Sequence, residues 1–417
     1  MESLRFLSAA EVRTIAREHG TPVYVYDEAT LRDRATQVLA FPNAFGLCAR
    51  YAMKALPTAA VVQVLTDAGL CIDASSGFEA ERALRAGVAP EKIQITAQEL
   101  PRNLKELVGQ GISFNACSMN QLRAYGTLFP GSDISIRVNP GLGSGHSNRT
   151  NVGGPSASFG IWHEHLGEVK AIAAEHTLRI TGMHTHVGSG TDPDAWAQCA
   201  RLSLGIVEQL PDVTWLSLGG GFKVGRMSGE SSADMAKIGT RVTADFEAFA
   251  QKHGRELHLE VEPGTFLVAN AGALLCSVAD IVDTGDAGYT FLKIDAGMTE
   301  IVRPSMYGAQ HPIVVIPQSD EERGQGNYLI TGHCCESGDI LTPEPGNPEG
   351  LAPRELCEAK VGDYVVIEGA GAYCASMASK NYNAFPECAE LMRGVDGALR
   401  VIRKRQKLSQ ILQNEVV

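Results

Sequence analysis

At three places in this sequence, residues that could take part in chemistry stand where a short apolar run ends and a loop begins. Lys54 ends the run Tyr51–Met53, and a lysine amine partly removed from water becomes nucleophilic because burial lowers its pKa. His186 precedes a turn of small residues, and Gly219–Gly221 follow a third run. Three successive glycines let backbone amides approach an anion closely. Taken singly these signals are weak, because most strand-end lysines are solvated and many glycine triplets are only tight turns.

Glu262 decides how this set is interpreted. It ends an otherwise apolar run, and a buried carboxylate needs a cationic partner. No metal-ligand spacing surrounds it, so no metal site is predicted, whereas a protonated heterocycle would supply the positive charge. A nucleophilic lysine, a carboxylate for a ring nitrogen, a histidine beside a flat ring and a glycine turn for a phosphate suit pyridoxal 5′-phosphate. A carboxylate that keeps the ring nitrogen protonated favours decarboxylation over racemisation.

The elements that must position these residues alternate between β-branched runs and amphipathic helical patterns, from about residue 30 to residue 270. Such alternation predicts parallel strands joined by crossover helices. Eight units of this length fit a (β/α)8 barrel, whose functional residues collect at the carboxyl ends of the strands; a doubly wound open sheet is the alternative. The predicted strands are Phe45–Met53, Cys71–Ala74, Ile93–Ala97, Ser113–Ala116, Ile134–Val138, Ile180–Val187, Trp215–Leu218 and His258–Glu262.

Strand-like segments separated by turns follow Asn270, and helical periodicity is scarce until the last ten residues. The expected fold class is therefore α/β, a TIM-like (β/α)8 barrel plus a C-terminal, mostly β domain joined by an N-terminal strand, Val23–Tyr26. We assign residues 1–29 to a helix and strand that pack with the β domain. Residues 30–270 form the cofactor-binding barrel, and residues 271–417 form the β domain with its terminal helix.

The composition excludes several other kinds of protein. The 417 residues carry 36 basic and 48 acidic side chains, a net charge of −12, and the basic run Arg403–Arg405 is short, so nucleic-acid binding is not expected. No apolar run approaches the roughly 20 residues of a membrane span, and the first residues lack a secretory pattern. We expect a cytoplasmic protein. The ten cysteines include no CxxC pair, which argues against a structural zinc site.

Eight motifs in a fixed order make the sequence resemble a known family. They are YAMKA around Lys54, RVNPGLGSGHSNRTNVGG from Arg137, HVGSG from His186, GGGF from Gly219, EPG from Glu262, RPSMYG from Arg303, CESGD from Cys335 and GAYCASMASKNYN from Gly371. Over nearly its whole length, the chain resembles the alanine-racemase-fold (fold-type III) decarboxylases that use pyridoxal phosphate. Among these it is most similar to the diaminopimelate decarboxylases.

The resemblance implies how the cofactor is held. Lys54 would attach it covalently, His186 would stack on its ring and Glu262 would pair with the ring nitrogen, while Asp73 and Arg137 would orient Lys54. The phosphate and the turn beside it would involve Ser189, Gly219, Gly220, Gly221, Pro263, Gly264, Thr265 and Tyr373.

The resemblance also implies a proton donor and a substrate. Cys335 would donate a proton to the site of the other subunit in a head-to-tail homodimer, and its polar, glycine-containing loop suits an exposed, reactive thiol. Arg303, Tyr307, Glu336 and Tyr373 would recognise the distal end of the substrate. The implied reaction is decarboxylation of meso-2,6-diaminopimelate to L-lysine and CO2, the last step of lysine biosynthesis.

Two residues differ from the pattern of the family and bear on the identity of the substrate. Thr265 stands where close relatives usually have arginine, and Ser158 stands where the family commonly has lysine. A related decarboxylase for carboxynorspermidine or a siderophore precursor is therefore the nearest alternative. Glu262 disfavours a racemase, and the complete set of cofactor residues disfavours an inactive regulatory homologue.

Overall fold

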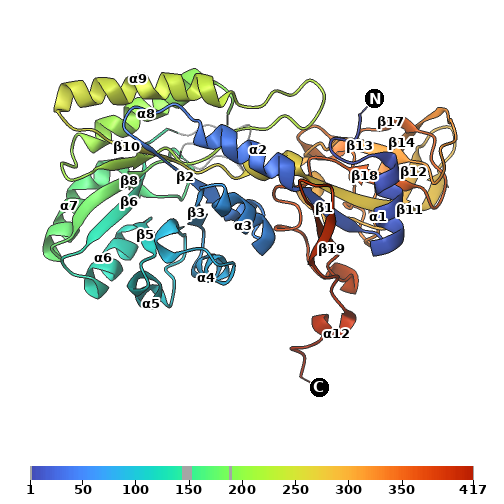
Figure 1. Ribbon diagram of the computed structural model, residues 1–417, viewed down its shortest axis with the longest axis horizontal. Helices are drawn as coiled ribbons and strands as arrows, with labels where there is room; N and C mark the ends of the chain where they lie inside the picture. The colour runs from blue at the N-terminus through green and yellow to red at the C-terminus, as the bar shows by residue number, and fades with distance from the viewer. Residues whose placement is uncertain (1, 143–152, 187–189, 417) are drawn as a thin grey trace. The chain divides into compact units, whose positions relative to one another are not determined.

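The computed structural model describes residues 2–142, 153–186 and 190–416 (Figure 1). Contacts within the chain define two compact units. The β unit comprises Met1–Leu31, Gly225–Glu230 and Val268–Val417, and the barrel unit comprises Arg32–Val224 and Ser231–Leu267. Ser189, from the HVGSG motif, and residues 143–152 of the motif that begins at Arg137 lie outside the described residues.

Eight parallel strands form a closed barrel in the barrel unit. In barrel order they are β2 (Leu47–Ala52), β3 (Cys71–Ala74), β4 (Ile93–Thr96), β5 (Ser113–Ala116), β6 (Asp133–Asn139), β8 (Arg179–His184), β9 (Trp215–Ser217) and β10 (His258–Val261). The pairing of β10 with β2 closes the ring, with Val261 opposite Ala49. The predicted barrel is therefore confirmed, and the open sheet is excluded. A two-residue strand, β7 (Ile161–Trp162), adds to β6 and was not predicted.

Helices follow the strands along the chain, as crossover connections require. They are α3 (Ala59–Asp67), α4 (Gly77–Arg85), α5 (Leu104–Gly109), α6 (Met119–Leu128), α7 (Leu166–Glu175), α8 (Pro193–Val207) and α9 (Met235–His253). Serine caps start two of them, because the Ser76 and Ser118 hydroxyls accept backbone N–H groups three residues later. Gly254 ends α9 in the left-handed conformation. Within the described ranges, no helix has the length and apolar character needed to cross a bilayer.

The β unit contains the N-terminal strand at the centre of a large sheet. β1 (Val23–Asp27) runs antiparallel to β11 (Gly272–Asp283) and parallel to β19 (Ala389–Arg393). The remaining strands of this sheet are β12 (Thr290–Ile294), β13 (Ile313–Ile316), β14 (Gln325–Thr331), β17 (Arg354–Cys357), β18 (Tyr364–Ile367) and β20 (Leu399–Arg403). The helix α1 (Ala9–His19) packs buried Val12 and Ile15 into the core beside β1. The predicted β domain with an N-terminal strand is thus confirmed.

The sequence prediction missed two strands of this sheet. β19 reads AELMR and β17 reads RELC, so both contain residues that favour helices and neither contains a β-branched residue. β19 is nevertheless mostly buried because β1 and β20 flank it. Tertiary pairing, rather than local preference, makes this segment a strand.

Candidate active site

Lys54 lies just past the end of β2. The 3-10 helix η1 (Met53–Ala55) follows the strand directly, and the Leu56 N–H donates to the Met53 carbonyl at 3.1 Å. Met53 and Ala55 are buried, whereas Lys54 is exposed. The partial removal of the Lys54 amine from water therefore stays a prediction. The pairing of β2 with β3 ends at Ala52, so Lys54 stands beyond the paired part of the strand.

Glu262 follows β10 and is buried. Side chains from β8 and β9 bind both of its oxygens: His184 Nε2 is 2.8 Å from Oε2, and the Ser217 hydroxyl donates to Oε1 at 2.9 Å. Burial opposes ionisation, but the interaction with His184 and the hydrogen bond from the Ser217 hydroxyl lower the Glu262 pKa. Glu262 is therefore an ionised carboxylate, and its remaining lone pairs can accept one more donor.

Two glycines allow close approach, one to the His186 side chain and the other to the Glu262 backbone. Gly219 has a φ of +71°, and a Cβ there would lie 2.6 Å from His186 Nδ1. At Gly220 a Cβ would lie 2.3 Å from the Glu262 carbonyl oxygen. The His186 Nδ1 atom is buried without a hydrogen-bond partner in the described structure. Burial and the charge of Arg137 hold the His186 pKa well below its ordinary value, so the ring is neutral.

Asp73 and Arg137 are buried on β3 and β6. Burial and then the charge of Glu262 raise the Asp73 pKa, while the charge of Lys54 opposes this rise. The Arg137 guanidinium carbon lies 4.9 Å from the centre of the Phe159 ring. Asp73 Oδ1 and Arg137 Nη2 have no hydrogen-bond partner among the described residues. Their role in orienting Lys54 stays a prediction.

A hydrogen bond joins the turn after β10 to the end of β2. The Pro263 carbonyl accepts the Ala52 N–H at 3.2 Å, and a Cβ at Gly264 would lie 3.2 Å from the Ala52 carbonyl oxygen. Thr265 begins the short helix α10 (Thr265–Val268). Gly221 has a φ of +99°, a conformation that residues with a side chain rarely adopt.

The predicted substrate residues belong to the β unit. Arg303 and Tyr307 stand at the two ends of α11 (Arg303–Tyr307). The Tyr307 hydroxyl lies 4.0 Å from Met377 Sδ. Tyr373 has a φ of +57°, an uncommon conformation for a non-glycine residue. Among the predicted cofactor residues that the structure describes, only Tyr373 lies outside the barrel unit.

Cys335 and Glu336 are exposed in a loop of the β unit. The Cys335 N–H donates to Asn383 Oδ1 at 2.9 Å, which holds the loop in place. The neighbouring Cys334 is buried, and its N–H donates to Asp339 Oδ2 at 2.9 Å. Burial and the charge of Asp339 raise the Cys334 pKa to about 12, so this thiol is inert. The loop thus presents one of its two thiols to solvent.

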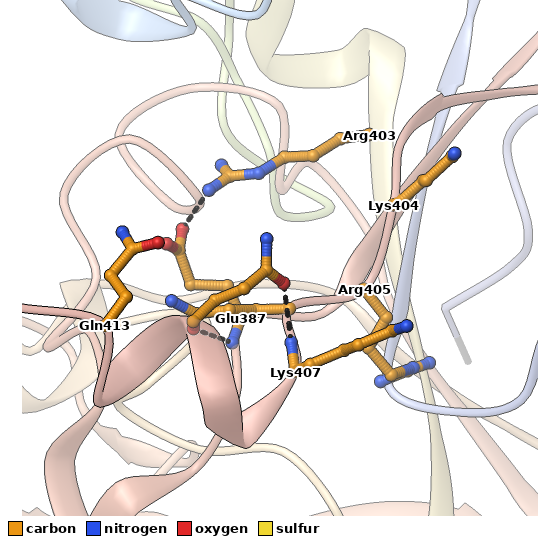
Figure 2. Close-up of a pocket in the computed structure, with 8 residues that line it drawn as sticks. Glu387, Arg403, Lys404, Arg405, Lys407 and Gln413 are labelled. Carbon is orange, nitrogen blue, oxygen red and sulfur yellow. Dashed lines mark hydrogen bonds and ion pairs between the residues drawn. The ribbon is translucent and has the colours of Figure 1, made fainter.

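The sequence analysis missed the roles of His184 and Ser217 in binding Glu262. His184 and His186 are two residues apart, a spacing that puts both on one side of a strand but does not reveal which residue each contacts. A separate cavity of about 620 Å³ contains none of the predicted site residues (Figure 2). It is lined by Glu387, Arg403, Lys404, Arg405, Gln406, Lys407, Gln410 and Gln413.

The barrel residues fit pyridoxal phosphate. Glu262 can accept a ring N–H, and the neutral His186 ring can lie against a flat heterocycle. The glycine turn leaves no room for side chains, as a phosphate held by backbone amides requires. The unpartnered polar atoms of Asp73 and Arg137 are suited to further polar contacts.

Comparison with known proteins agrees with this chemistry. The sequence model of the family described as "Pyridoxal-dependent decarboxylase, pyridoxal binding domain" matches residues 31–269. The diaminopimelate decarboxylase of Streptomyces coelicolor is 36% identical over 98% of this chain and 92% of its own length. That of Escherichia coli K12 is 34% identical over 99% and 97%.

The fold of this chain is also similar to those of solved structures. A crystal structure of diaminopimelate decarboxylase superposes with a TM-score of 0.91 at 34% identity, covering 98% of this chain and 96% of the other. The Helicobacter pylori diaminopimelate decarboxylase in complex with L-lysine gives 0.83 at 26% identity, with 96% and 98% coverage. From its barrel to its β unit, this chain belongs to the pyridoxal-dependent decarboxylase family.

Proposed function

We propose that this enzyme decarboxylates meso-2,6-diaminopimelate at its D-configured centre, giving L-lysine and CO2 in the last step of lysine biosynthesis. The observation that carries the proposal is similarity along nearly the full length to diaminopimelate decarboxylases at 34–36% identity. The buried, ionised Glu262 supports the reaction type, since decarboxylation needs a protonated ring nitrogen.

The chain's own residues divide the work between them. Bound pyridoxal phosphate supplies an electron sink for the electron pair that remains when CO2 leaves. Lys54 would hold the cofactor through its amine, Glu262 would keep a proton at the ring nitrogen, and His186 would contact the ring. The backbone from Gly219 to Gly221 binds the phosphate. Cys335 from a second copy of the chain would supply the proton that the α-carbon takes up after CO2 has left.

Two further parts of the proposal concern assembly and location. A head-to-tail homodimer would bring Cys335, which is exposed in its loop, to the site of the other subunit. The enzyme would work in the cytoplasm, and all ten cysteines are free thiols, as a reducing compartment requires. Activity should fall on dilution to a verified monomer, and full activity in that monomer would contradict the shared site.

The decisive assay offers the cofactor-loaded enzyme several substrates in parallel. Meso-diaminopimelate, ornithine, lysine, arginine and carboxynorspermidine would each be followed by CO2 release, with Lys54→Ala as the inactive control. We expect selective turnover of meso-diaminopimelate. Turnover of carboxynorspermidine instead would keep the reaction type and change the substrate, and Thr265 and Ser158 would then explain the difference.

A further inference from the structure

A cavity near the C-terminal end of the β unit is not part of the proposed reaction. It has a volume of about 620 Å³ and is lined by residues from β20, from the segment that follows it and from the short helix α12 (Leu408–Ile411) (Figure 2). Small-molecule sites in proteins typically occupy about 300–1,000 Å³, so a small ligand would fit. No described residue of the predicted cofactor and substrate sites lines this space, which we call the C-terminal cavity.

The lining of the C-terminal cavity is strongly basic. Its eight residues include four cations, Arg403, Lys404, Arg405 and Lys407, and one acid, Glu387; the other three are glutamines. The whole chain has a net charge of −12, so its overall composition does not account for this excess of positive charge. Cations gathered around a hollow raise the local concentration of anions there. The lining therefore favours a negatively charged ligand.

The two arginines and the acid already have partners within the protein. The Glu387 carboxylate pairs with Arg403, as Figure 2 shows, and Lys380 Nζ lies 2.8 Å from the same carboxylate. Two cations therefore balance the one acid of the lining. The Arg405 Nη2 atom donates to the Pro22 carbonyl at 2.8 Å, which directs this guanidinium to the backbone. Both arginines are thus held by the protein itself.

Lys404 and Lys407 differ from these residues. Both are exposed, and neither amine forms an ion pair within the part of the chain that the structure describes. The backbone around them is fixed by hydrogen bonds: the Lys407 N–H donates to Gln410 Oε1 at 2.8 Å, and Gln406 Oε1 accepts the Glu387 N–H at 3.0 Å. The cavity therefore has an ordered wall that carries two ammonium groups without an acidic partner in the described chain.

The chemistry of these two amines selects the class of anion. An arginine fork matches a carboxylate through two parallel bonds, whereas a lysine ammonium acts as a point charge and is a common phosphate binder. Two separate point charges need a ligand with at least two charged groups. We propose that the C-terminal cavity binds a polyphosphate, either inorganic or the phosphate chain of a nucleoside triphosphate, and that Lys404 and Lys407 supply the attraction. This site is independent of the proposed decarboxylation, because it shares no described residue with it.

Calorimetric titration of the cofactor-loaded enzyme with inorganic tripolyphosphate tests the proposal. Loading fills the site for the cofactor's own phosphate, so the titration reports a second site. The wild type should bind, and Lys404→Gln/Lys407→Gln should raise the Kd at least roughly tenfold, because both charge contacts are lost. Binding to the wild type should weaken as salt is added, since exposed charges are screened. Orthophosphate, which carries fewer charges, should bind more weakly than tripolyphosphate.

A parallel titration with ATP distinguishes the two sources of the polyphosphate. Tighter binding of ATP than of tripolyphosphate would assign the site to a nucleotide, and the reverse would assign it to an inorganic polyphosphate. In either case the variant Lys404→Gln/Lys407→Gln should lose the affinity.

A second double variant is the matched control. Lys105→Gln/Lys170→Gln removes two exposed lysines from helices α5 and α7 and changes the net charge by the same amount. Its Kd should equal that of the wild type. Equal weakening by both double variants would overturn the proposal, since binding would then follow the net charge of the protein. The absence of binding to the wild type at about 1 mM tripolyphosphate would overturn it as well.

Melting and assembly provide two further readouts. Tripolyphosphate should raise the melting temperature of the wild type and of the control variant, but not that of Lys404→Gln/Lys407→Gln. Without ligand all three proteins should melt together, because the substituted side chains are exposed. If sedimentation shows that Lys404→Gln/Lys407→Gln alters the oligomeric state while its affinity for tripolyphosphate is unchanged, the cavity is a contact between copies of the chain and the proposal is refuted.

Discussion

The buried pair of His184 and Glu262 allows a quantitative prediction. Replacing His184 by alanine leaves the Glu262 carboxylate buried, with Ser217 as its remaining side-chain partner in the described structure. Removing the hydrogen-bond partner of a buried carboxylate typically costs about 1–3 kcal/mol, and more when the carboxylate is charged, because the remaining group is desolvated without compensation. The free energy of unfolding of His184→Ala should therefore fall by about this amount at pH 8.

The loss should become smaller at lower pH. Without His184, burial dominates and raises the Glu262 pKa in the folded state above its value in the unfolded chain. The folded variant then takes up a proton before the unfolded chain does as the pH falls, which relieves the uncompensated charge. Urea unfolding at pH 8 and pH 5, followed by circular dichroism, would measure both losses, and the loss at pH 5 should be the smaller.

The double variant His184→Ala/Glu262→Gln is the matched control. It removes the charge whose burial causes the instability, so it should regain most of the stability that the single variant loses at pH 8. An equal loss in the single and double variants would refute the reasoning, since the cost would then come from the cavity left by the imidazole. The same conclusion would follow if the loss were independent of pH.

Three further variants test other parts of the structure. Lys54→Ala should abolish both turnover and the absorbance of covalently bound cofactor, and normal turnover would remove Lys54 from the mechanism. Gly220→Ala places a Cβ against the Glu262 carbonyl oxygen, so cofactor affinity should fall in a fluorescence titration; unchanged affinity would contradict the tight turn. Burial raises the Glu368 pKa to about 7, above the ordinary 4.5, so ionisation destabilises the fold as pH rises through this range. Glu368→Gln, which can still accept the Arg5 N–H, should therefore increase stability at pH 8 by on the order of 2–3 kcal/mol and by little at pH 4, as thermal melts would show.

The barrel could be predicted from sequence because short, mostly apolar runs alternate with amphipathic helical patterns along this part of the chain. Cys71–Ala74 and Ser113–Ala116 were predicted with their observed bounds. β19 could not be predicted, because AELMR has no strand signal of its own and is a strand through its pairing with β1. Local composition therefore located the strands of the barrel better than those of the β unit.

The candidate site was predicted in part. Residue type and position at strand ends were enough to select Lys54, His186 and Glu262, whose cofactor roles stay predictions. The exposure of Lys54 could not be anticipated, because it depends on where the pairing of β2 ends.

The central position of β1 has a consequence for synthesis of the chain on the ribosome. Asp27 on β1 and Arg393 on β19 are separated by 366 residues, yet they pair in the finished sheet. At a translation rate of 5–20 residues per second, this strand waits roughly 20 to 70 seconds for that neighbour. The barrel strands are all translated before β19 emerges, so the barrel can fold first. During that interval, the nascent chain carries an apolar strand without its final neighbours, which makes it a natural binding segment for a chaperone.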